Sequence, residues 1–494
     1  MPDNARTYDE LTRLIASTYE NPDLGLVSRA YEMAEGAHQG IIRLTGDPYI
    51  VHPLAVAYKL AEMGSNLNVV AAGLLHDVVE DSEITVEEVS AKFGEDIASL
   101  VDSLTKLKKV KYSGTDRYAE NMRKMFLAMA SDVRVVFIKF ADRLHNLKTL
   151  YAQPRHKQER IAKESLEIYA PIAGRLGMSE FKGEIEDLCF EYLYPRDYER
   201  VRDMITAKVR EKGAYVSRII DQTEKFLAEF NIVDAAVHGR VKRLYSLFKK
   251  LGKYDDDLSK VYDLIAIRVI VKDVEECYGV LGILHQKFTP MPGRIKDYLA
   301  QPKPNGYQSL HTTVFTDDGE IVEFQIRTQE MHELAEFGVA AHWRYKEAGM
   351  SPLKNLYWME ELAKIQKELS GKKDFMEQLE IMKIDVFKDR IFVFTPNGDV
   401  IDLPEGASPV DFAYAIHTEL GNKCSAARVN GVMRNLDTAL RSNDVVEIVT
   451  DKNRRGPNPD WIKFVKTHHA RSKIKDAAKS TVSGWLRGMI SRKA

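Results

Sequence analysis

Residues 74–81 read Leu-Leu-His-Asp-Val-Val-Glu-Asp, and this stretch decides how the first part of the chain is interpreted. Residues four apart lie on one face of a helix, so His76 and Asp77 would share a face with Glu80 and Asp81. Apolar residues flank the four polar ones, which predicts that they face a core. A buried histidine among carboxylates is costly unless a positive charge lies between them, so the stretch predicts a divalent metal site.

Two further residues have the right chemistry for metal ligands. His52 precedes Pro53 in Ile-Val-His-Pro, and Asp142 lies in Ala-Asp-Arg-Leu-His-Asn. Any one of these residues alone is more often a satisfied polar group at the start of a helix. That explanation fits the whole set much less well, so we expect the set to meet around one ion.

Composition bounds the class of protein. The chain has 494 residues, of which 44% are hydrophobic, enough for roughly two to four domains. Net charge is −2, but twelve Lys/Arg against three Asp/Glu give residues 451–494 about +9 and leave the rest about −11. This basic segment suggests a polyanionic partner, although a solvated helix face explains it equally well. The scattered cysteines exclude a disulfide framework, and the lack of a signal peptide or long apolar run predicts a cytoplasmic protein with no membrane segment.

Hydrophobic periodicity predicts a multidomain α plus α/β chain. Residues 1–200 are predicted to be all-helical, because apolar residues recur at intervals of three and four, and residues 201–230 to form a charged helical connector. Residues 231–346 are predicted to be α/β. There, Val261–Val271 suits a central strand, and His311–Phe315 and Ile321–Thr328 flank a hairpin turn.

The remainder is predicted to hold one small module. A second helical connector spans 347–385, and 386–450 is predicted to form a β-grasp module in which a helix starts after the N-cap candidate Ser408. The basic segment 451–494 is predicted to be helical.

A second group of polar residues lies within 231–346. The Pro- and Gly-stiffened loop before His311 presents Tyr307, whose ring suits a nucleobase, beside a lysine that suits a phosphate. In the strand after it, Glu323, Gln325 and Arg327 alternate with apolar residues and so share one face. Basic residues for a triphosphate are predicted along one helical stretch: Arg240, Lys242, Arg243, Lys249 and Lys250. Asp263 could join Glu323 in holding Mg²⁺, which favours nucleotide phosphoryl transfer.

Together these motifs resemble the long RelA/SpoT-family proteins, which make and destroy the alarmones pppGpp and ppGpp. The His-Asp pair with its distant His and Asp, the Gly-Tyr-Gln-Ser-Leu-His loop and Glu-Phe-Gln-Ile-Arg-Thr follow one another as in that family. The resemblance implies an all-helical HD-type hydrolase domain, an α/β nucleotidyltransferase-like synthetase domain and a β-grasp TGS domain. Arg294-Ile-Lys-Asp297 matches the basic version of a short motif, which is associated with bifunctional members of the family. The chain stops at Ala494, before the later region with an ACT domain.

The resemblance also implies residue roles. Ligands of Mn²⁺ would be His52, His76, Asp77 and Asp142, with Glu80 and Asp81 orienting and activating water. Asp263 and Glu323 would hold Mg²⁺, and Glu323 would also accept the proton of the acceptor 3′-hydroxyl. Nucleotide contacts would come from Arg43, Asn146, Arg240, Lys242, Lys250, Arg268, Lys296, Lys303, Asn305, Tyr307, His311 and Gln325. His417 would contact tRNA. Two positions depart from the family pattern, namely Leu44 and Gly174.

The activity implied is the transfer of pyrophosphate from ATP to the 3′-OH of GDP or GTP, giving (p)ppGpp and AMP. The resemblance also implies the opposed activity, hydrolysis of (p)ppGpp to GDP or GTP and pyrophosphate. The ribosome and uncharged tRNA would be partners through the TGS domain and the basic segment, as in the stringent response. Two alternatives are a synthetase whose HD region is only structural, and a ribosome- or tRNA-binding regulator with weak catalysis.

Overall fold

The computed structural model describes residues 6–108, 132–261, 263–303, 305–338, 340–341, 390–442, 444–451, 453–454 and 456–477. The predicted connector 347–385 and the last part of the predicted basic segment, 478–494, lie outside these ranges. The chain forms two compact units, Met1–Ile365 and Gln366–Ala494. Within the described residues, no helix combines the length and the apolar character that a membrane span requires.

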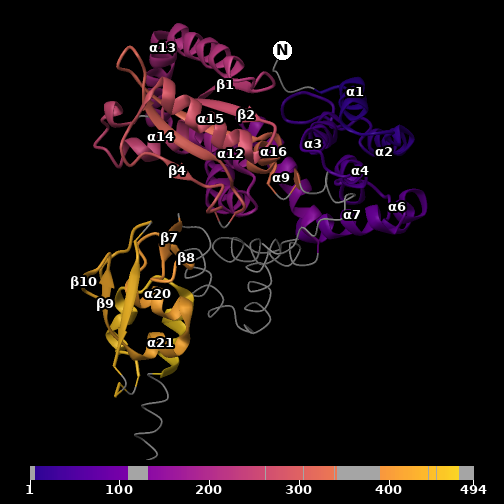
Figure 1. Cartoon of the computed structure of the whole chain (residues 1–494). Helices are drawn as coiled ribbons and strands as arrows, with labels where there is room; N and C mark the ends of the chain where they lie inside the picture. Colours follow the sequence, from indigo (N-terminus) through magenta and orange to yellow (C-terminus); the bar gives the residue numbers. More distant parts are fainter. Residues whose placement is uncertain are drawn as a thin grey trace, which may run out of the picture. The chain divides into compact units, whose positions relative to one another are not determined.

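The first part of the chain is helical, as predicted (Figure 1). Its elements are α1 (Tyr8–Thr18), α2 (Leu24–Ala37), α3 (Val51–Glu62), α4 (Leu67–Leu75), α5 (Val78–Asp81), α6 (Val86–Phe93), α7 (Glu95–Lys108), α9 (Val133–Lys148), η1 (Leu150–Ala152), α10 (Arg155–Glu164), η2 (Ser165–Tyr169), α11 (Ala170–Arg175) and α12 (Ser179–Leu193). Capping boxes at Thr7 and Thr85 start α1 and α6, where each threonine and a glutamate three residues later satisfy each other's backbone N–H groups. Every residue from Val69 to Leu75 in α4 is buried, which makes this helix the centre of the helical core.

The prediction of one continuous helix through residues 74–81 is wrong. Helix α4 ends at Leu75 and α5 begins at Val78, so that His76 and Asp77 lie in the turn between them. Both residues are buried, whereas Glu80 and Asp81 are exposed. The apolar residues around the turn pack equally well on either side of a break, so local periodicity does not reveal it.

Helix α13 (Pro195–Glu229) matches the helix predicted for 201–230, but it begins earlier, at Pro195, and ends one residue earlier, at Glu229. Proline suits the first turn of a helix, where its missing N–H has no intrahelical partner. Ile219 and Leu227 of α13 are buried in the hydrophobic core of the sheet that follows. The helix therefore forms one wall of the α/β part.

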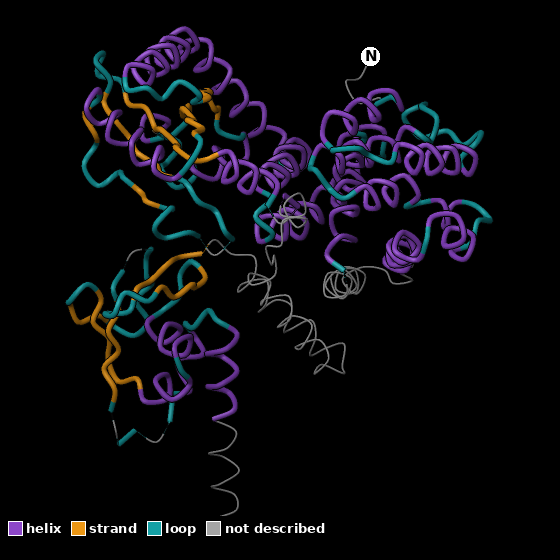
Figure 2. The backbone as a smooth tube through the Cα atoms, turned by 45° about the vertical axis from the view of Figure 1, so that its right-hand side comes forward, coloured by secondary structure: helices purple, strands orange, loops and turns teal. Residues whose placement is uncertain are grey.

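The α/β part is built on a six-stranded sheet of order β1-β2-β6-β5-β3, with β4 paired to β5. Its strands are β1 (Ala236–Val241), β2 (Ile265–Val271), β3 (Thr289–Pro290), β4 (Lys296–Asp297), β5 (Leu310–Phe315) and β6 (Ile321–Thr328), and its helices are α14 (Leu244–Leu251), η3 (Leu258–Lys260), α15 (Val274–Lys287) and α16 (Gln329–Phe337). The central strand and the β5–β6 hairpin were predicted correctly. Strands β2 and β6 pair in parallel, and the other pairs are antiparallel. Figure 2 shows α13 and α15 beside the strands.

One prediction for this part is wrong. Arg240 lies on β1, and α14 begins only at Leu244, so the basic residues from Arg240 to Lys250 do not share one helix. The alternation of β6 is as predicted, because Val322, Phe324 and Ile326 belong to the hydrophobic core. Gln325 and Arg327, on the other face, are also buried, and Arg327 pairs with Glu336 of α16.

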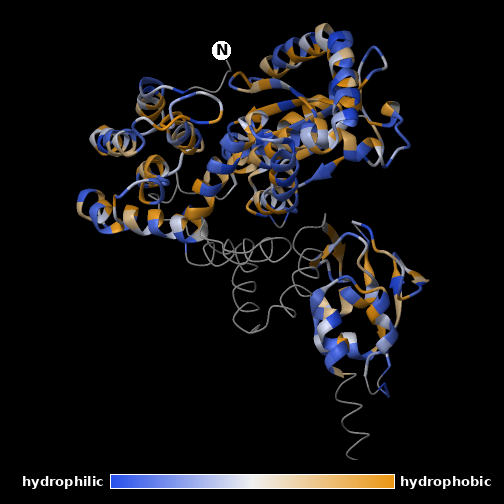
Figure 3. Ribbon diagram, turned by 180° about the vertical axis from the view of Figure 1, so that it is seen from behind, coloured by the Kyte–Doolittle hydropathy of each residue, from blue (hydrophilic) through white to orange (hydrophobic). Residues whose placement is uncertain are grey.

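The second unit has the strand and helix pattern expected of a β-grasp module. Its elements are β7 (Arg390–Phe394), β8 (Val400–Pro404), α20 (Pro409–Ile416), α21 (Thr418–Lys423), β9 (Cys424–Val429), β10 (Val432–Arg434), β11 (Val446–Thr450) and η5 (Pro459–Lys463). Strands β7 and β8 form a hairpin, β9 pairs with β10 and β11, and Phe394 bridges Val445 in parallel. Ser408 is the N-cap of α20, as predicted, in a capping box with Asp411. Figure 3 shows apolar segments on the strands and helices that enclose this core.

Candidate active sites

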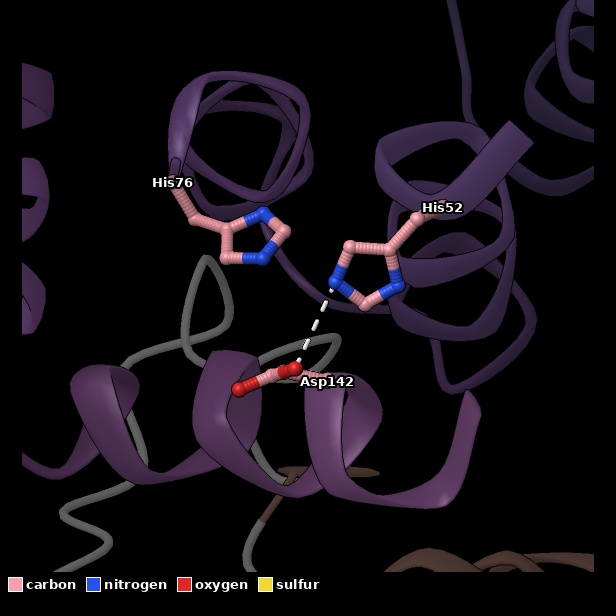
Figure 4. Close-up of side chains that lie close together, drawn as sticks. All are labelled: His52, His76 and Asp142. Carbon is pink, nitrogen blue, oxygen red and sulfur yellow. Dashed lines mark ion pairs between the residues drawn. The ribbon is translucent and has the colours of Figure 1, made fainter. Parts of the chain in front are cut away.

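Helix α3, the turn after α4 and helix α9 bring His52, His76 and Asp142 together in the helical part (Figure 4). One ligand atom of each lies within 4.8 Å of the others, and all three residues are buried. His52 Nε2 is 3.4 Å from Asp142 Oδ1. Asp77 adds a fourth candidate ligand atom, because its Oδ2 lies 3.6 Å from His52 Nε2 and 3.2 Å from His76 Nε2. Two imidazole nitrogens and two carboxylates are a donor set that suits a divalent first-row metal, so the residues fit the ion that the sequence predicts.

Neighbouring groups fix how these ligands are oriented. His76 Nδ1 lies 2.8 Å from the Gly73 carbonyl, which can only accept, so this nitrogen carries the proton and Nε2 presents its lone pair. The Tyr49 hydroxyl donates to Asp77 Oδ2 over 2.7 Å, and burial raises the pKa of that tyrosine. Lys139 Nζ donates to Asp142 Oδ2 over 2.7 Å. The carboxylates are therefore held by hydrogen bonds before any ion binds.

A cavity of about 550 Å³ opens beside the cluster. His52, Asp77 and Asp142 line it together with the cationic side chains of Arg43, Lys139, Arg143 and Arg160. Arg43 donates to Asn146 Oδ1 over 3.4 Å, so the structure brings these two predicted nucleotide contacts together. Burial lowers the pKa of Arg43. The cavity thus combines a metal-ligand set with cations, which suits a polyphosphate.

Glu80 and Asp81 do not line this cavity. Asp81 lies against His38, with 3.8 Å between Oδ2 and Nε2. Leu44, one of the two positions noted above as departures, lies at the rim of this cavity and is 69% exposed.

The polar face of the sheet forms the second candidate site. Gln325 Nε2 donates to Glu323 Oε1 over 2.9 Å, and Arg240 donates to Gln325 Oε1 over 3.0 Å. His311 Nδ1 lies 3.4 Å from Glu323 Oε1, and the Tyr307 hydroxyl lies 2.8 Å from His311 Nε2. Burial would raise the pKa of Glu323, but the His311 and Gln325 donors outweigh it and hold the pKa below its ordinary value. Glu323 is therefore an ionised, oriented carboxylate.

Asp263 is the second acidic group of this site. Its two oxygens accept from Lys242 over 2.7 Å and from Lys250 over 2.6 Å. Burial would raise the pKa of Asp263, yet these lysines outweigh it and hold the pKa at about 2. Asp263 and Glu323 line one cavity of about 70 Å³ with Lys296 and other cationic side chains. One or two carboxylates beside phosphate-binding cations is the usual setting of Mg²⁺, so the residues fit that ion.

The loop before β5 packs more tightly than the sequence suggests. Tyr307 was predicted to stand out from a turn, but it is half-buried, with Lys303 Nζ 4.8 Å from the centre of its ring. Burial, then Lys296 and Lys182, lower the pKa of Lys303 to about 8. Asn305 donates to the Gly174 carbonyl over 3.4 Å, which ties this loop to the helical part.

An arginine cluster extends the polar face under α16. Arg327 donates a hydrogen bond to Glu336 Oε1 over 3.0 Å, and Arg268 forms an ion pair with the same oxygen at 3.1 Å. Burial, and then Arg327, lower the pKa of Arg268 to about 10. Arg240 and Arg268 lie on the paired strands β1 and β2, and both alternate with residues of the core face, so these two predicted nucleotide contacts share the polar face. In the second unit, His417 is exposed between α20 and α21, where its Nδ1 accepts from the Glu419 N–H over 3.2 Å.

Several site residues were missed from the sequence: Tyr49, Lys139, His145 and Glu336. A signal existed for two of them, because Lys139 and His145 lie three residues before and after Asp142 and so share its face of α9. Glu336 meets its arginines only across separate elements, and no sequence spacing shows that.

The sequence of this chain is similar to those of known proteins. The chain matches family models described as an HD domain over residues 30–179, a region found in RelA / SpoT proteins over 239–350, and a TGS domain over 391–450. It is 42% identical over 478 residues to the bifunctional (p)ppGpp synthase/hydrolase SpoT of Escherichia coli (strain K12), covering 96% of this chain and 67% of that protein. The chain belongs to the RelA/SpoT family. The predicted family and its helical HD, synthetase and TGS regions are thereby confirmed.

Other relatives carry one or the other activity in their names. This RelA/SpoT-family chain is 47% identical over 455 residues to the guanosine-3′,5′-bis(diphosphate) 3′-pyrophosphohydrolase of Aquifex aeolicus (strain VF5), covering 92% of this chain and 64% of that protein. It is 46% identical over 476 residues to the GTP pyrophosphokinase of Streptomyces coelicolor (strain ATCC BAA-471 / A3(2) / M145), covering 92% of this chain and 56% of that protein. The chain thus spans less than two thirds of the length of these two relatives. The match to a solved structure of the small alarmone synthetase 1 from Bacillus subtilis bound to its product pppGpp covers 34% of this chain and 95% of that one, with 23% sequence identity and a TM-score of 0.25.

Proposed function

We propose that this chain is a bifunctional alarmone enzyme that both makes and hydrolyses (p)ppGpp. The observation that carries the proposal is the presence, on one chain, of two separate clusters with different chemistry. One is the buried His52, His76, Asp77 and Asp142 set beside a cationic cavity. The other is the Glu323 and Asp263 pair beside basic side chains that could bind phosphates.

In hydrolysis, the first cluster would hold Mn²⁺ through His52, His76, Asp77 and Asp142. The ion would supply Lewis-acid chemistry, polarising phosphate oxygens and lowering the pKa of water. Tyr49 and Lys139 orient two of the carboxylates through hydrogen bonds.

The nucleotide and the proton are handled by residues around this set. Arg43 and Asn146 would bind the nucleotide in the cavity that they share. Glu80 and Asp81 would orient the attacking water and accept its proton. The bond that breaks joins the ribose 3′-oxygen to the pyrophosphate group. The products are pyrophosphate and GDP or GTP.

In synthesis, Glu323 would accept the proton of the acceptor 3′-hydroxyl. The 3′-oxygen then bonds to the β-phosphorus of ATP, the bond between that phosphorus and the α,β-bridging oxygen breaks, and AMP leaves. Asp263 and Glu323 would hold Mg²⁺, which would neutralise charge on the transferring phosphates.

Substrate binding in synthesis would fall to the side chains around these carboxylates. Lys242, Lys250 and Lys296 supply fixed positive charge beside Asp263. Arg240 and Arg268 would sandwich the adenine, and Tyr307 would stack on the acceptor guanine. Lys303, Asn305, His311 and Gln325 would complete the nucleotide contacts.

The second unit would add RNA binding. His417 is exposed on the TGS domain, and the excess of Lys/Arg over Asp/Glu in residues 451–494 suits a polyanion. We propose the acceptor end of uncharged tRNA and the ribosome as partners.

The test is to incubate the chain with ATP and GDP, and separately with ppGpp and Mn²⁺, and then to separate the nucleotides. The proposal expects ppGpp with AMP in the first reaction, and GDP with pyrophosphate in the second. Accumulation of ADP would show ordinary phosphoryl transfer instead. Synthesis without hydrolysis would favour a structural HD region, and salt-sensitive RNA binding without turnover would favour a regulator.

A further inference from the structure

A buried histidine outside the predicted ligand set contacts one of the ligands directly. His145 on α9 is 4% exposed, and its Nδ1 lies 2.8 Å from Nδ1 of His52. A hydrogen bond between two imidazole nitrogens needs one N–H donor and one bare acceptor. One of the two Nδ1 atoms therefore carries no proton, and the ring to which it belongs can hold its proton only on Nε2.

The two ligand histidines are therefore oriented by different means. The backbone carbonyl of Gly73 settles which nitrogen of His76 is protonated, because a carbonyl cannot donate. Nδ1 of His52 contacts the His145 imidazole instead of a carbonyl, and an imidazole nitrogen can either donate or accept. Nε2 of His52 faces Asp77 and Asp142, so a metal there requires this nitrogen to be bare and the proton to be on Nδ1.

The surroundings of His145 favour that arrangement. If His52 Nδ1–H donates to His145 Nδ1, the proton of His145 must be on Nε2. Among the described residues this Nε2 has no hydrogen-bond partner, and His145 lines a second cavity, of about 330 Å³, together with Lys148 and Glu184. A polar cavity of that size has room for an acceptor such as water.

We propose that His145 is a positioning residue that selects the His52 tautomer able to bind the divalent ion. The inference rests on the proposed hydrolase function, since it concerns the ion of that site. In the opposite tautomer, His52 Nε2–H would donate to Asp142 and offer no lone pair. Loss of such a partner of a metal ligand typically weakens metal affinity about 10–100-fold.

The test measures Mn²⁺ binding by isothermal titration calorimetry on the whole metal-free chain and three variants. His145→Leu removes the acceptor, whereas His145→Asn keeps one, because the asparagine Oδ1 can occupy the place of Nδ1. His156→Leu removes an exposed imidazole and serves as the control. Urea unfolding of each metal-free variant reports its stability independently.

We expect His145→Leu to bind Mn²⁺ about 10–100-fold more weakly than the wild type, and His145→Asn and His156→Leu to bind nearly as tightly as it does. Equal affinity in the wild type and His145→Leu would overturn the inference while leaving the hydrolase site in place. Equal weakening in both His145 variants would also overturn it, because the loss would then follow packing rather than the acceptor. A wild-type chain that binds no Mn²⁺ would overturn the proposed hydrolase function as well.

Discussion

Gly338, directly after α16, lies with its backbone against the turn at Leu176 and Gly177 of the helical part. Its φ is +56°, and a Cβ atom built on it would lie 2.1 Å from the Leu176 oxygen and 2.6 Å from the Gly177 carbonyl carbon. A side chain in this conformation costs about 1–3 kcal/mol. Moving the packed turn aside costs about 1–3 kcal/mol more. Gly338→Ala should therefore lower the free energy of unfolding by about 2–6 kcal/mol.

The matched control is Gly279→Ala in the middle of α15, where a Cβ meets nothing within 4 Å. This change should raise stability by about 0.5–1 kcal/mol, because alanine favours the helix. Urea unfolding followed by circular dichroism compares both variants with the wild type. A Gly338→Ala chain within about 0.5 kcal/mol of the wild type would refute the close backbone approach, since that is the spread of an ordinary surface substitution.

Other predictions concern the synthetase face. Glu323→Gln keeps the shape of the side chain but removes the proton acceptor, so AMP formation should fall by about 10²-fold or more; an undiminished rate would exclude this role. Tyr307→Ala should weaken guanine-nucleotide binding by roughly 1–3 kcal/mol if stacking dominates, and unchanged binding would place the base elsewhere. Lys303 has a pKa of about 8, so it loses its charge as pH rises through that value and KM for the guanine nucleotide should then increase. Lys303→Arg stays charged, and a KM that rises equally in this variant would contradict the assignment.

The sheet was predictable because its residues obey local rules. The β6 residues alternate strictly between core and polar face, so the sequence alone placed Glu323, Gln325 and Arg327 together. Ser408 and Asp411 form the capping box that starts α20 by local hydrogen bonds. Such elements depend on interactions between residues that are close in sequence, so one sequence is enough to predict them.

The rest depends on contacts between distant segments. The break between α4 and α5 places His76 and Asp77 in a turn, and the apolar residues on both sides hide it. Tyr49 reaches Asp77 from another segment, and Glu336 reaches Arg268 across two elements. No periodicity in the sequence encodes those distances.

Two separate active sites are tested by measuring both reactions in the same preparations of wild type, Asp77→Ala and Glu323→Gln, with circular dichroism to verify folding. We expect Asp77→Ala to lose Mn²⁺ and ppGpp hydrolysis while it still forms ppGpp and AMP. We expect the reverse for Glu323→Gln, which should hydrolyse ppGpp at the wild-type rate. Undiminished hydrolysis in Asp77→Ala, or loss of both reactions in either folded variant, would contradict two separate active sites.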